Sequence, residues 1–332
     1  MKKFPIRLTV ALLLLSLLPL SAQAVRTLIP MGQVVGLELY NNTVTVAAFD
    51  QGSNAQAAGL QVGDRLLSID GIPINAPEDV RSALARSDGT VELTVRRDDR
   101  VVKLKLQPVT TADGPKLGVY LRRGITGIGT LTYYDPQTGT FGTLGHGVND
   151  PDGTVLTMTS GNLYSAAVAS VRKGRCGDPG QLIGTLRSTV PIGILQRNTP
   201  QGVFGKLNEP VSHQSLPIAT SNSIRPGKAT ILSTVSGSTV QEYSVEILKI
   251  YPASRQTGRN MLLKVTDPAL LSTTGGIVQG MSGSPIIQDG KLVGAVTHVL
   301  VNDPTRGYGI FIENMLDVTQ SVAGEQALKD AS

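Results

Sequence analysis

The sequence predicts a mainly β protein, in which a small α+β domain precedes one or two β-barrels. The chain has 332 residues, a length that favours two domains over one. Its 37 glycines and 19 prolines indicate many turns. Apolar runs of strand length recur between these turns, and long helical periodicity is scarce.

The N-terminus has the pattern of a secretory signal. Lys2, Lys3 and Arg7 precede an apolar run over residues 8–20, and small residues follow up to Ala24. We expect cleavage after Ala24 and export of the mature chain, with a retained membrane anchor as the alternative. Residues 25–33 are interpreted as a linker.

Charge and cysteine content argue against a nucleic-acid-binding protein and against a fold stabilised by internal disulfides. Residues 1–24 hold three of the 30 basic and none of the 25 acidic side chains, so the mature chain would carry a net charge of +2. Nucleic-acid binding therefore has no electrostatic support. The single Cys176 cannot form an internal disulfide, and we expect it to be buried or incidental rather than a thiol nucleophile.

Residues 34–108 predict the α+β domain. A strand over residues 43–48 is followed by turn signals, and a helix is expected over residues 76–87 with Asn75 as its N-cap. Two strands, 91–96 and 101–106, complete the unit. Residues 109–116 are polar and predict a linker, and residues 117–332 then contain the barrel strands.

Ser282 is the candidate nucleophile. It lies in Gly280-Met281-Ser282-Gly283, ahead of a predicted β-hairpin. Glycines on both sides permit positive φ angles and allow a substrate to approach the backbone, and the N–H groups of Gly280 and Ser282 could bind an oxyanion. The structural alternative is an ordinary surface turn.

His146 is the candidate base for Ser282. It ends a predicted strand in Gly145-His146-Gly147, and an imidazole titrates near neutral pH. Thr297 and His298, on the strand after the nucleophile loop, are interpreted as walls of the substrate cleft. A third, carboxylate member could orient the ring, and spacing does not choose among four candidates: Asp150, Asp152, Asp178 and Asp267.

The first domain resembles a PDZ domain. Ala-Gly-Leu-x-x-Gly-Asp at residues 58–64 precedes Leu-x-x-Ile-Asp-Gly at residues 66–71. The resemblance implies peptide binding by strand addition, either to a peptide C-terminus or to an internal strand. The amides of Val35, Gly36 and Leu37 would bind the carboxylate, and Leu39, Val80 and Leu84 would line the groove. The alternative is a groove that is unused or packs on the neighbouring domain.

The second domain resembles chymotrypsin-like serine proteases and, more specifically, the stage IV sporulation protein B family, peptidase family S55. The likeness lies in Gly145–Val148, Thr266-Asp267 and residues 274–286, 294–299 and 301–305. It implies a double β-barrel in which His146 and Ser282 are catalytic and Asp267 is the third member. In chymotrypsin-like enzymes the aspartate lies between the histidine and the serine in the first barrel, whereas Asp267 lies only 15 residues before Ser282.

The family also implies a setting in sporulation. We expect release into the space between forespore and mother cell, self-cleavage, and cleavage of a membrane-anchored regulator that inhibits an intramembrane metalloprotease. That cleavage would activate the metalloprotease and a late sigma factor.

The combined prediction is an exported serine endopeptidase. We expect no cofactor or metal, because no His-x-x-x-His or Cys-x-x-Cys spacing occurs. The alternative is a PDZ adaptor with a catalytically silent barrel, which would act by docking a membrane partner.

Overall fold

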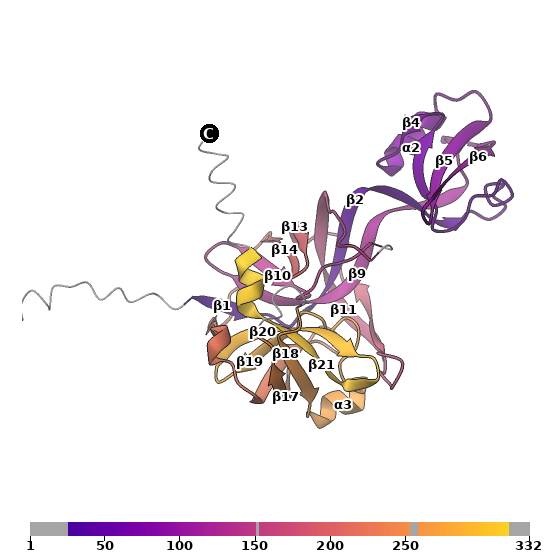
Figure 1. The fold of residues 1–332 in the computed structure, drawn as a ribbon. Coiled ribbons are helices and arrows are strands. Elements are labelled where there is room, and N and C mark those ends of the chain that lie inside the picture. The colour runs from indigo at the N-terminus through magenta and orange to yellow at the C-terminus, as the bar shows by residue number, and fades with distance from the viewer. Residues whose placement is uncertain (1–25, 151–152, 253–257, 319–332) are drawn as a thin grey trace, which may run out of the picture.

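The computed structural model describes residues 26–150, 153–252 and 258–318, and in these ranges the fold is mainly β, as predicted (Figure 1). The expected signal at residues 1–24 lies outside the described residues. Within the described ranges, no helix combines the length and hydropathy needed to cross a bilayer.

Six strands of the N-terminal half pair in a closed cycle, which we call the first barrel. β9 pairs with both β10 and β2, and β14, β13 and β11 complete the connection from β10 back to β2. β1, β12 and β15 pair at the margins. The bounds are β1 Thr27–Pro30, β2 Val34–Phe49, β9 Val119–Asp135, β10 Thr140–Thr143, β11 Ser160–Arg172, β12 Gln181–Leu186, β13 Gly193–Thr199, β14 Gly202–Leu207 and β15 Leu216–Pro217.

Six further strands close the second barrel, in the order β16-β17-β18-β21-β20-β19. A short 3-10 helix, η1, precedes this barrel, α3 lies between β18 and β19, and residues 312–318 are helical. The bounds are η1 Ser221–Ser223, β16 Gly227–Ser233, β17 Gln241–Ile250, β18 Met261–Val265, α3 Pro268–Thr274, β19 Pro285–Gln288, β20 Lys291–Leu300 and β21 Asp303–Phe311.

Residues 44–121 form a separate unit, the inserted domain, between two strands of the first barrel. β2 leaves the barrel to enter this domain and β9 returns from it, so the domain stands away from both barrels (Figure 1). It has its own apolar core, which includes Leu66, Val80 and Leu93. Its other elements are β3 Arg65–Ile69, β4 Ile72–Pro73, α2 Pro77–Leu84, β5 Val91–Arg97, β6 Arg100–Leu106, β7 Val109–Thr111 and β8 Gly114–Lys116.

Gly124 marks the point where β9 passes from the inserted domain into the barrel. Its φ is +72°, and a Cβ at this position would lie 1.8 Å from the carbonyl oxygen of Leu39. Only glycine fits so close to the paired strand in this conformation. The register between β2 and β9 also shifts here, between Leu39 and Val44.

The predicted domain boundaries need correction at both ends of the inserted domain. Residues 34–39 are not part of it, because they pair with β9 and β11 inside the first barrel. Residues 25–33 contain strand β1, and residues 109–116 form the β7–β8 hairpin, so neither segment is a linker. An apolar strand pattern gives no indication of which domain supplies the partner strands.

The predicted peptide-binding residues are consequently separated. Val35, Gly36, Leu37 and Leu39 have strands on both edges and cannot accept a peptide strand, so this prediction is wrong. Val80 and Leu84 do lie in the inserted domain, on the buried face of α2. The helix begins after Ala76 rather than Asn75, and the Asp79 carboxylate accepts hydrogen bonds from the Asn75 and Ala76 amides, both at 2.9 Å.

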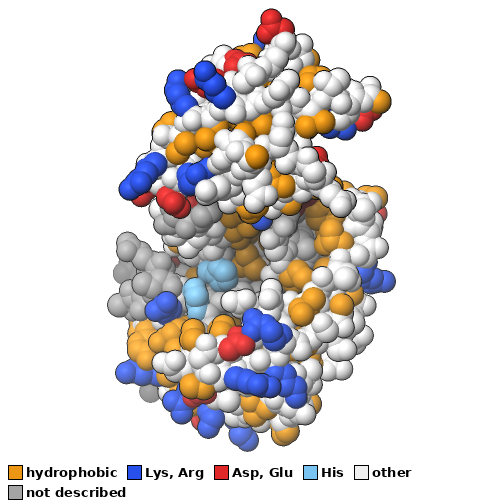
Figure 2. Space-filling view, turned by 90° about the vertical axis from the view of Figure 1, so that its right-hand side faces the viewer, with side chains coloured by type: hydrophobic (Ala, Val, Ile, Leu, Met, Phe, Trp, Pro, Cys, Tyr) orange, Lys and Arg blue, Asp and Glu red, His pale blue; other side chains and the backbone are white. Residues whose placement is uncertain are grey.

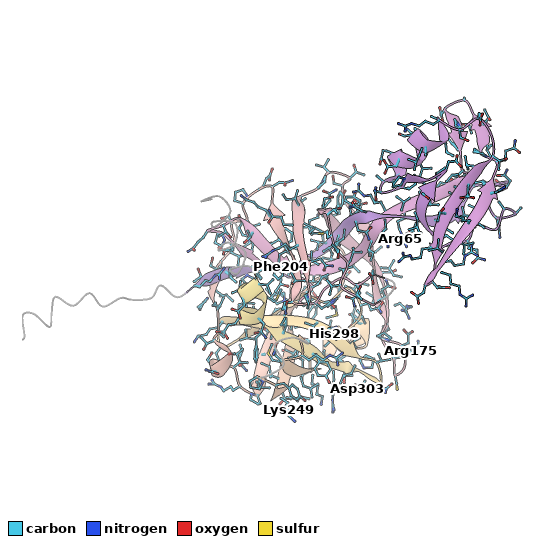
Figure 3. The ribbon with its side chains drawn as sticks, turned by 45° about the horizontal axis from the view of Figure 1, so that its top comes forward. Arg65, Arg175, Phe204, Lys249, His298 and Asp303 are labelled. Atoms are coloured by element: carbon cyan, nitrogen blue, oxygen red, sulfur yellow. The ribbon has the colours of Figure 1, made fainter. Side chains whose placement is uncertain are left out.

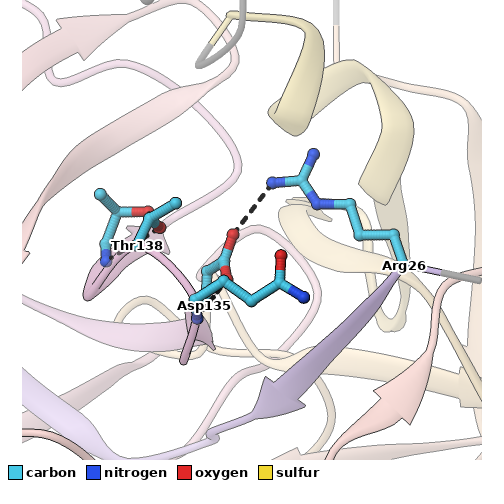
Figure 4. Close-up of polar contacts among 5 residues, drawn as sticks. Arg26, Asp135 and Thr138 are labelled. Carbon is cyan, nitrogen blue, oxygen red and sulfur yellow. Dashed lines mark hydrogen bonds and ion pairs between the residues drawn. The ribbon is translucent and has the colours of Figure 1, made fainter. Parts of the chain in front are cut away.

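An ion pair ties the first described residues to the first barrel. Arg26 Nη2 lies 3.1 Å from Asp135 Oδ2, at the end of β9 (Figure 4). The other oxygen, Oδ1, accepts the Gln137 amide at 2.9 Å. Because Asp135 is almost fully buried, this pairing satisfies a carboxylate that would be costly to leave alone.

Candidate active site

A cleft of about 960 Å³ lies between the two barrels, and both candidate catalytic side chains line it. His146 comes from the loop after β10, and Ser282 from the loop between α3 and β19. Figure 2 shows histidine side chains at a hollow bordered by hydrophobic groups. The structure therefore brings together two residues that are 136 positions apart in the sequence.

The nucleophile loop depends on glycine at two positions. Gly280 and Gly283 have φ angles of +97° and +98°. A Cβ at Gly283 would lie 2.0 Å from the Thr130 carbonyl oxygen, so the loop is pressed against β9. These angles explain why glycine occurs on both sides of Ser282.

Strand β9 holds this loop by two hydrogen bonds from Thr130. The Thr130 hydroxyl donates to the Gly280 carbonyl at 2.8 Å, and its amide donates to the Ser282 carbonyl at 3.0 Å. Meanwhile the N–H groups of Gly280 and Ser282 donate to no other described residue. The carbonyls are thus engaged by β9, whereas the two amides predicted to bind an oxyanion stay available.

The Ser282 hydroxyl does not yet face its base. Oγ donates to the Thr297 carbonyl at 2.7 Å. The hydroxyl must turn from this carbonyl before Ser282 can donate to His146. Catalytic hydrogen bonds commonly align only when substrate binds, so this geometry is that of a resting site.

His146 follows two residues in the left-handed region. Leu144 and Gly145 both have φ angles of +68°. A buried leucine in this region is strained, and such strain is frequent where a fold must aim a functional side chain.

The ring of His146 is oriented by its own loop. Nδ1 lies 2.8 Å from the Gly147 carbonyl oxygen. A carbonyl only accepts, so Nδ1 must carry the proton and Nε2 must be the free acceptor, the tautomer that a general base needs. Burial lowers the pKa of His146 below its ordinary 6.5, and the bond to Gly147 acts in the opposite direction. The ring is therefore neutral at pH 7.

Asn198 is a site residue that sequence reasoning missed. Asn198 lies on β13. Its side-chain Oδ1 accepts a hydrogen bond from the Val148 N–H at 2.8 Å, and its Nδ2 donates to the Val148 and Leu156 carbonyls at 2.7 and 3.0 Å. These three bonds clamp the loop two residues beyond His146. The sequence signal was a polar residue within a strand, but its partners lie 42 and 50 positions earlier.

Asp267 is not brought to His146. It is the N-cap of α3, where its carboxylate accepts the Leu270 amide at 3.0 Å and the Ser244 amide at 3.3 Å. One oxygen thus caps the start of this helix, the usual role of an aspartate before a proline, and the other ties it to β17. The geometry gives Asp267 a structural role in place of the orienting role implied by the family resemblance.

The other candidate carboxylates also have local partners. Asp150 accepts from the Thr154 amide and hydroxyl at 3.0 and 2.9 Å. Asp178 forms an exposed ion pair with Arg172, whose hydrogen bond lowers the pKa of that carboxyl. Asp152 lies outside the described residues.

Thr297 and His298 lie in the cleft wall on β20, where they were expected. The Thr297 hydroxyl is buried and lies 3.2 Å from the carbonyl oxygens of Gly258 and Tyr308. The His298 ring lies 5.0 Å from that of His146, within the body of the two barrels (Figure 3). Its Nδ1 is buried and has no hydrogen-bond partner among the described residues, and burial, the main cause, lowers the pKa of His298 to about 4.

The arrangement can perform acyl transfer. It offers a hydroxyl nucleophile, a neutral imidazole with a free Nε2, and two free amides in one cleft. Across the described residues, His, Cys, Asp and Glu nowhere gather in groups of three or more that could hold a metal ion. Cys176 is exposed, so of the two expectations, buried or incidental, the first is wrong.

Two family models match the chain. The SpoIVB peptidase S55 model matches residues 113–316, and a PDZ domain model matches residues 45–97. The second range falls within the inserted domain and excludes residues 34–39, in agreement with the corrected boundary.

Curated relatives and solved structures show more limited similarity. A protein of Agrobacterium fabrum whose name suggests a zinc metalloprotease is 29% identical over 45% of this chain and 41% of its own length. A similarly named protein of Rhizobium meliloti is 38% identical over 24% of this chain and 21% of its own. The chain thus spans less than half the length of these relatives.

Among solved structures, the Rv3671c protease from M. tuberculosis in its active form overlaps with a TM-score of 0.36 at 14% identity. That overlap covers 58% of this chain and 72% of the other. The HtrA-type protease AlgW with a tripeptide overlaps with a TM-score of 0.35 at 17% identity. That overlap covers 59% of this chain and 56% of AlgW.

Proposed function

The chain belongs to the SpoIVB peptidase S55 family, and from this premise we propose that it is a serine endopeptidase in which Ser282 and His146 act as nucleophile and base. One observation carries the proposal. Ser282, whose own amide and that of Gly280 donate to no described residue, shares a cleft with a half-buried histidine whose tautomer leaves Nε2 free to accept a proton.

The reaction would proceed by acyl transfer. The Ser282 hydroxyl turns from the Thr297 carbonyl to His146 Nε2, gives up its proton and attacks the peptide carbonyl. The amides of Gly280 and Ser282 then bind the oxyanion. His146 returns the proton to the leaving amine, and a water molecule, activated by the same ring, hydrolyses the acyl-enzyme.

Among the described residues, backbone groups and an amide, with no carboxylate, stabilise the charge that develops on His146. Nδ1–H keeps its bond to the Gly147 carbonyl, and Asn198 fixes the backbone next to it. A carbonyl stabilises an imidazolium less than a carboxylate does, so we expect a modest turnover number.

The inserted PDZ domain supports peptide recognition at a site other than the one predicted from the sequence. Between Val119 and Arg123, β9 pairs only with β2 among the described strands, and α2 lies against this part of the sheet. Its free edge is available for strand addition beside α2. Tyr120, on this segment, is 61% exposed.

The biological setting is part of the same proposal. An exported chain would act between forespore and mother cell, process itself, and cleave a membrane-anchored regulator of an intramembrane metalloprotease. The signal-like residues 1–24 and the peptide-binding edge support this setting.

The test is cleavage by the secreted full chain. Mass spectrometry of the secreted product and of a mixture of unstructured proteins should detect new termini with the wild type. Ser282→Ala and His146→Ala should each lower this activity at least about a thousandfold, as substitutions of the nucleophile or the base do in other serine peptidases. Full cleavage by folded Ser282→Ala would refute the proposal, whereas a folded wild type that binds peptides without cleaving them would support the silent adaptor.

A further inference from the structure

The walls of the catalytic cleft contain no charged side chain among the described residues. The lining residues that are not glycine are apolar or neutral polar groups, and the two histidines are the only titratable side chains among them. Burial lowers the pKa of both rings, which are therefore neutral at pH 7. Among the described residues, a substrate side chain in this cleft meets hydrocarbon and neutral hydrogen-bonding groups, and Arg259 acts from outside the lining, as a minor cause of the lowered pKa of His298.

Apolar surface flanks Ser282 on both sides. On the side of the second barrel, the wall consists of Ile277, Val278 and Val299, which belong to or pack against the core of that barrel. On the side of the first barrel, Leu37 and Leu144 belong to another core cluster. Because each wall is backed by a packed core, neither can rearrange easily to solvate a charge.

We propose that the substrate is a peptide segment with uncharged, apolar side chains on both sides of the scissile bond. Enclosing an aliphatic side chain gains about 25 cal/mol per Å² of apolar surface removed from water. An unpaired charge at the same place would lose its hydration without a counter-ion, a cost of several kcal/mol. Because enclosing an aliphatic side chain is favourable and enclosing an unpaired charge is costly, Lys, Arg, Asp and Glu are disfavoured on both sides of the scissile bond.

The neutral polar groups of the cleft limit this preference. Asn149 and Gln279 line the cleft and are exposed, so their neutral amide groups can form hydrogen bonds with a peptide group or a small polar side chain. Thr or Ser next to the scissile bond would therefore be tolerated better than any charged residue.

A cleavage profile tests the inference, which rests on the proposed peptidase function. The secreted wild type is incubated with a proteome-derived peptide library, and new termini are compared with those from Ser282→Ala. We expect each of the four charged residues to be depleted about tenfold or more on both sides of the cut, with aliphatic residues enriched. Enrichment of any charged residue at either position would overturn the inference.

Val299 offers a matched pair of variants, because it is half-buried in the wall and is not catalytic. Val299→Asp should raise the ratio of kcat/KM for a lysine-containing peptide over its valine counterpart about tenfold, by supplying a counter-ion. Val299→Thr, similar in shape but neutral, should leave this ratio unchanged. An unchanged ratio in an active Val299→Asp protein would show that this wall does not contact the substrate and would overturn the inference; if this variant does not fold, the wild-type profile decides.

Failure of the inference differs from failure of the proposed function. A wild type that reacts with a neutral fluorophosphonate at Ser282 but prefers charged residues contradicts only the inference. A folded wild type that neither reacts nor cleaves contradicts the peptidase function itself.

Discussion

The loops that carry Ser282 and His146 are held in different ways. The Ser282 loop is fixed from outside: Thr130 on β9 bonds two of its carbonyls, and Val296 on β20 accepts the Gly283 amide at 2.8 Å. The His146 ring instead bonds to the carbonyl of its neighbour, in a loop clamped by Asn198. The nucleophile is thus positioned by the scaffold of the first and second barrels, whereas the base relies on local backbone geometry.

This difference bears on the proposed mechanism, because no carboxylate of the described residues is bonded to the His146 ring. An aspartate in a triad fixes the tautomer and the orientation of the ring and stabilises its charge. Here the Gly147 carbonyl selects the tautomer, and Asn198 fixes the loop. The Gly147 carbonyl stabilises the positive charge on the His146 ring less well than the carboxylate of a triad would.

Among the groups that hold the two loops in place, the largest effect is expected from removing the clamp on the His146 loop. Asn198→Ala leaves the Val148 N–H and the Leu156 carbonyl without their partner, so the loop that orients the ring loses its clamp. We expect kcat to fall about 10- to 100-fold and the free energy of unfolding to fall by about 1–3 kcal/mol. Steady-state kinetics and denaturant unfolding measure the two effects. Unchanged kcat in a folded variant would show that the loop needs no clamp.

A smaller effect is expected at the nucleophile loop, because it has several supports. Thr130→Val removes the hydroxyl bond to Gly280 but keeps the backbone bond to Ser282. We expect kcat to fall about tenfold through misplacement of the Gly280 amide, with little change in KM. Thr130→Ser keeps the hydroxyl and is the control; equal losses in both variants would assign the effect to packing.

The pH profile reports on the base directly. Because the pKa of His146 is lowered by burial, the ring stays neutral and able to accept a proton below pH 6.5. The midpoint of the acid limb of kcat/KM should therefore lie below pH 6.5. The fall in kcat/KM from its plateau to pH 6 should be severalfold smaller than for an enzyme whose histidine has a pKa of 6.5. An acid limb above 6.5 would indicate a carboxylate partner that this geometry lacks.

The same lowered pKa has a consequence for stability. Below pH 6.5 the unfolded chain binds protons that His146 and His298 do not bind in the folded state. The free energy of unfolding should therefore fall as the pH falls from 6.5 toward 4.

The smallest effect on activity is expected at Asp267. Asparagine caps helices as well as aspartate does, so Asp267→Asn should keep kcat within about threefold. Asp267→Ala loses the cap and should lower the free energy of unfolding by about 0.5–2 kcal/mol. If Asp267→Asn loses activity as severely as Ser282→Ala while remaining folded, the carboxylate has a catalytic role and the comparison between the two loops must be revised.

The loops that carry Ser282 and His146 could be predicted because their signals are local. A glycine-flanked serine before a hairpin and a glycine-flanked histidine after a strand each specify a tight turn, and the structure has both. The PDZ fold was predictable from its turn motifs for the same reason, and the family is confirmed.

The features that escaped prediction depend on which strands meet. Residues 34–39 have an apolar pattern that suits a strand in either domain, and only their pairing with β9 and β11 assigns them to the barrel. Asn198 acts across 50 positions, and Asp267 lies before a proline in a pattern shared by helix caps and active sites. None of these outcomes follows from a local window.

The central claim is that Ser282 is a nucleophile activated by His146. A neutral fluorophosphonate reacts with such a serine, and mass spectrometry can locate the adduct in the secreted full chain. The claim predicts an adduct on the peptide that contains Ser282 in the wild type, much slower labelling in His146→Ala and none at this site in Ser282→Ala. A folded wild type that is not labelled at Ser282, or that is labelled equally fast in His146→Ala, would contradict it.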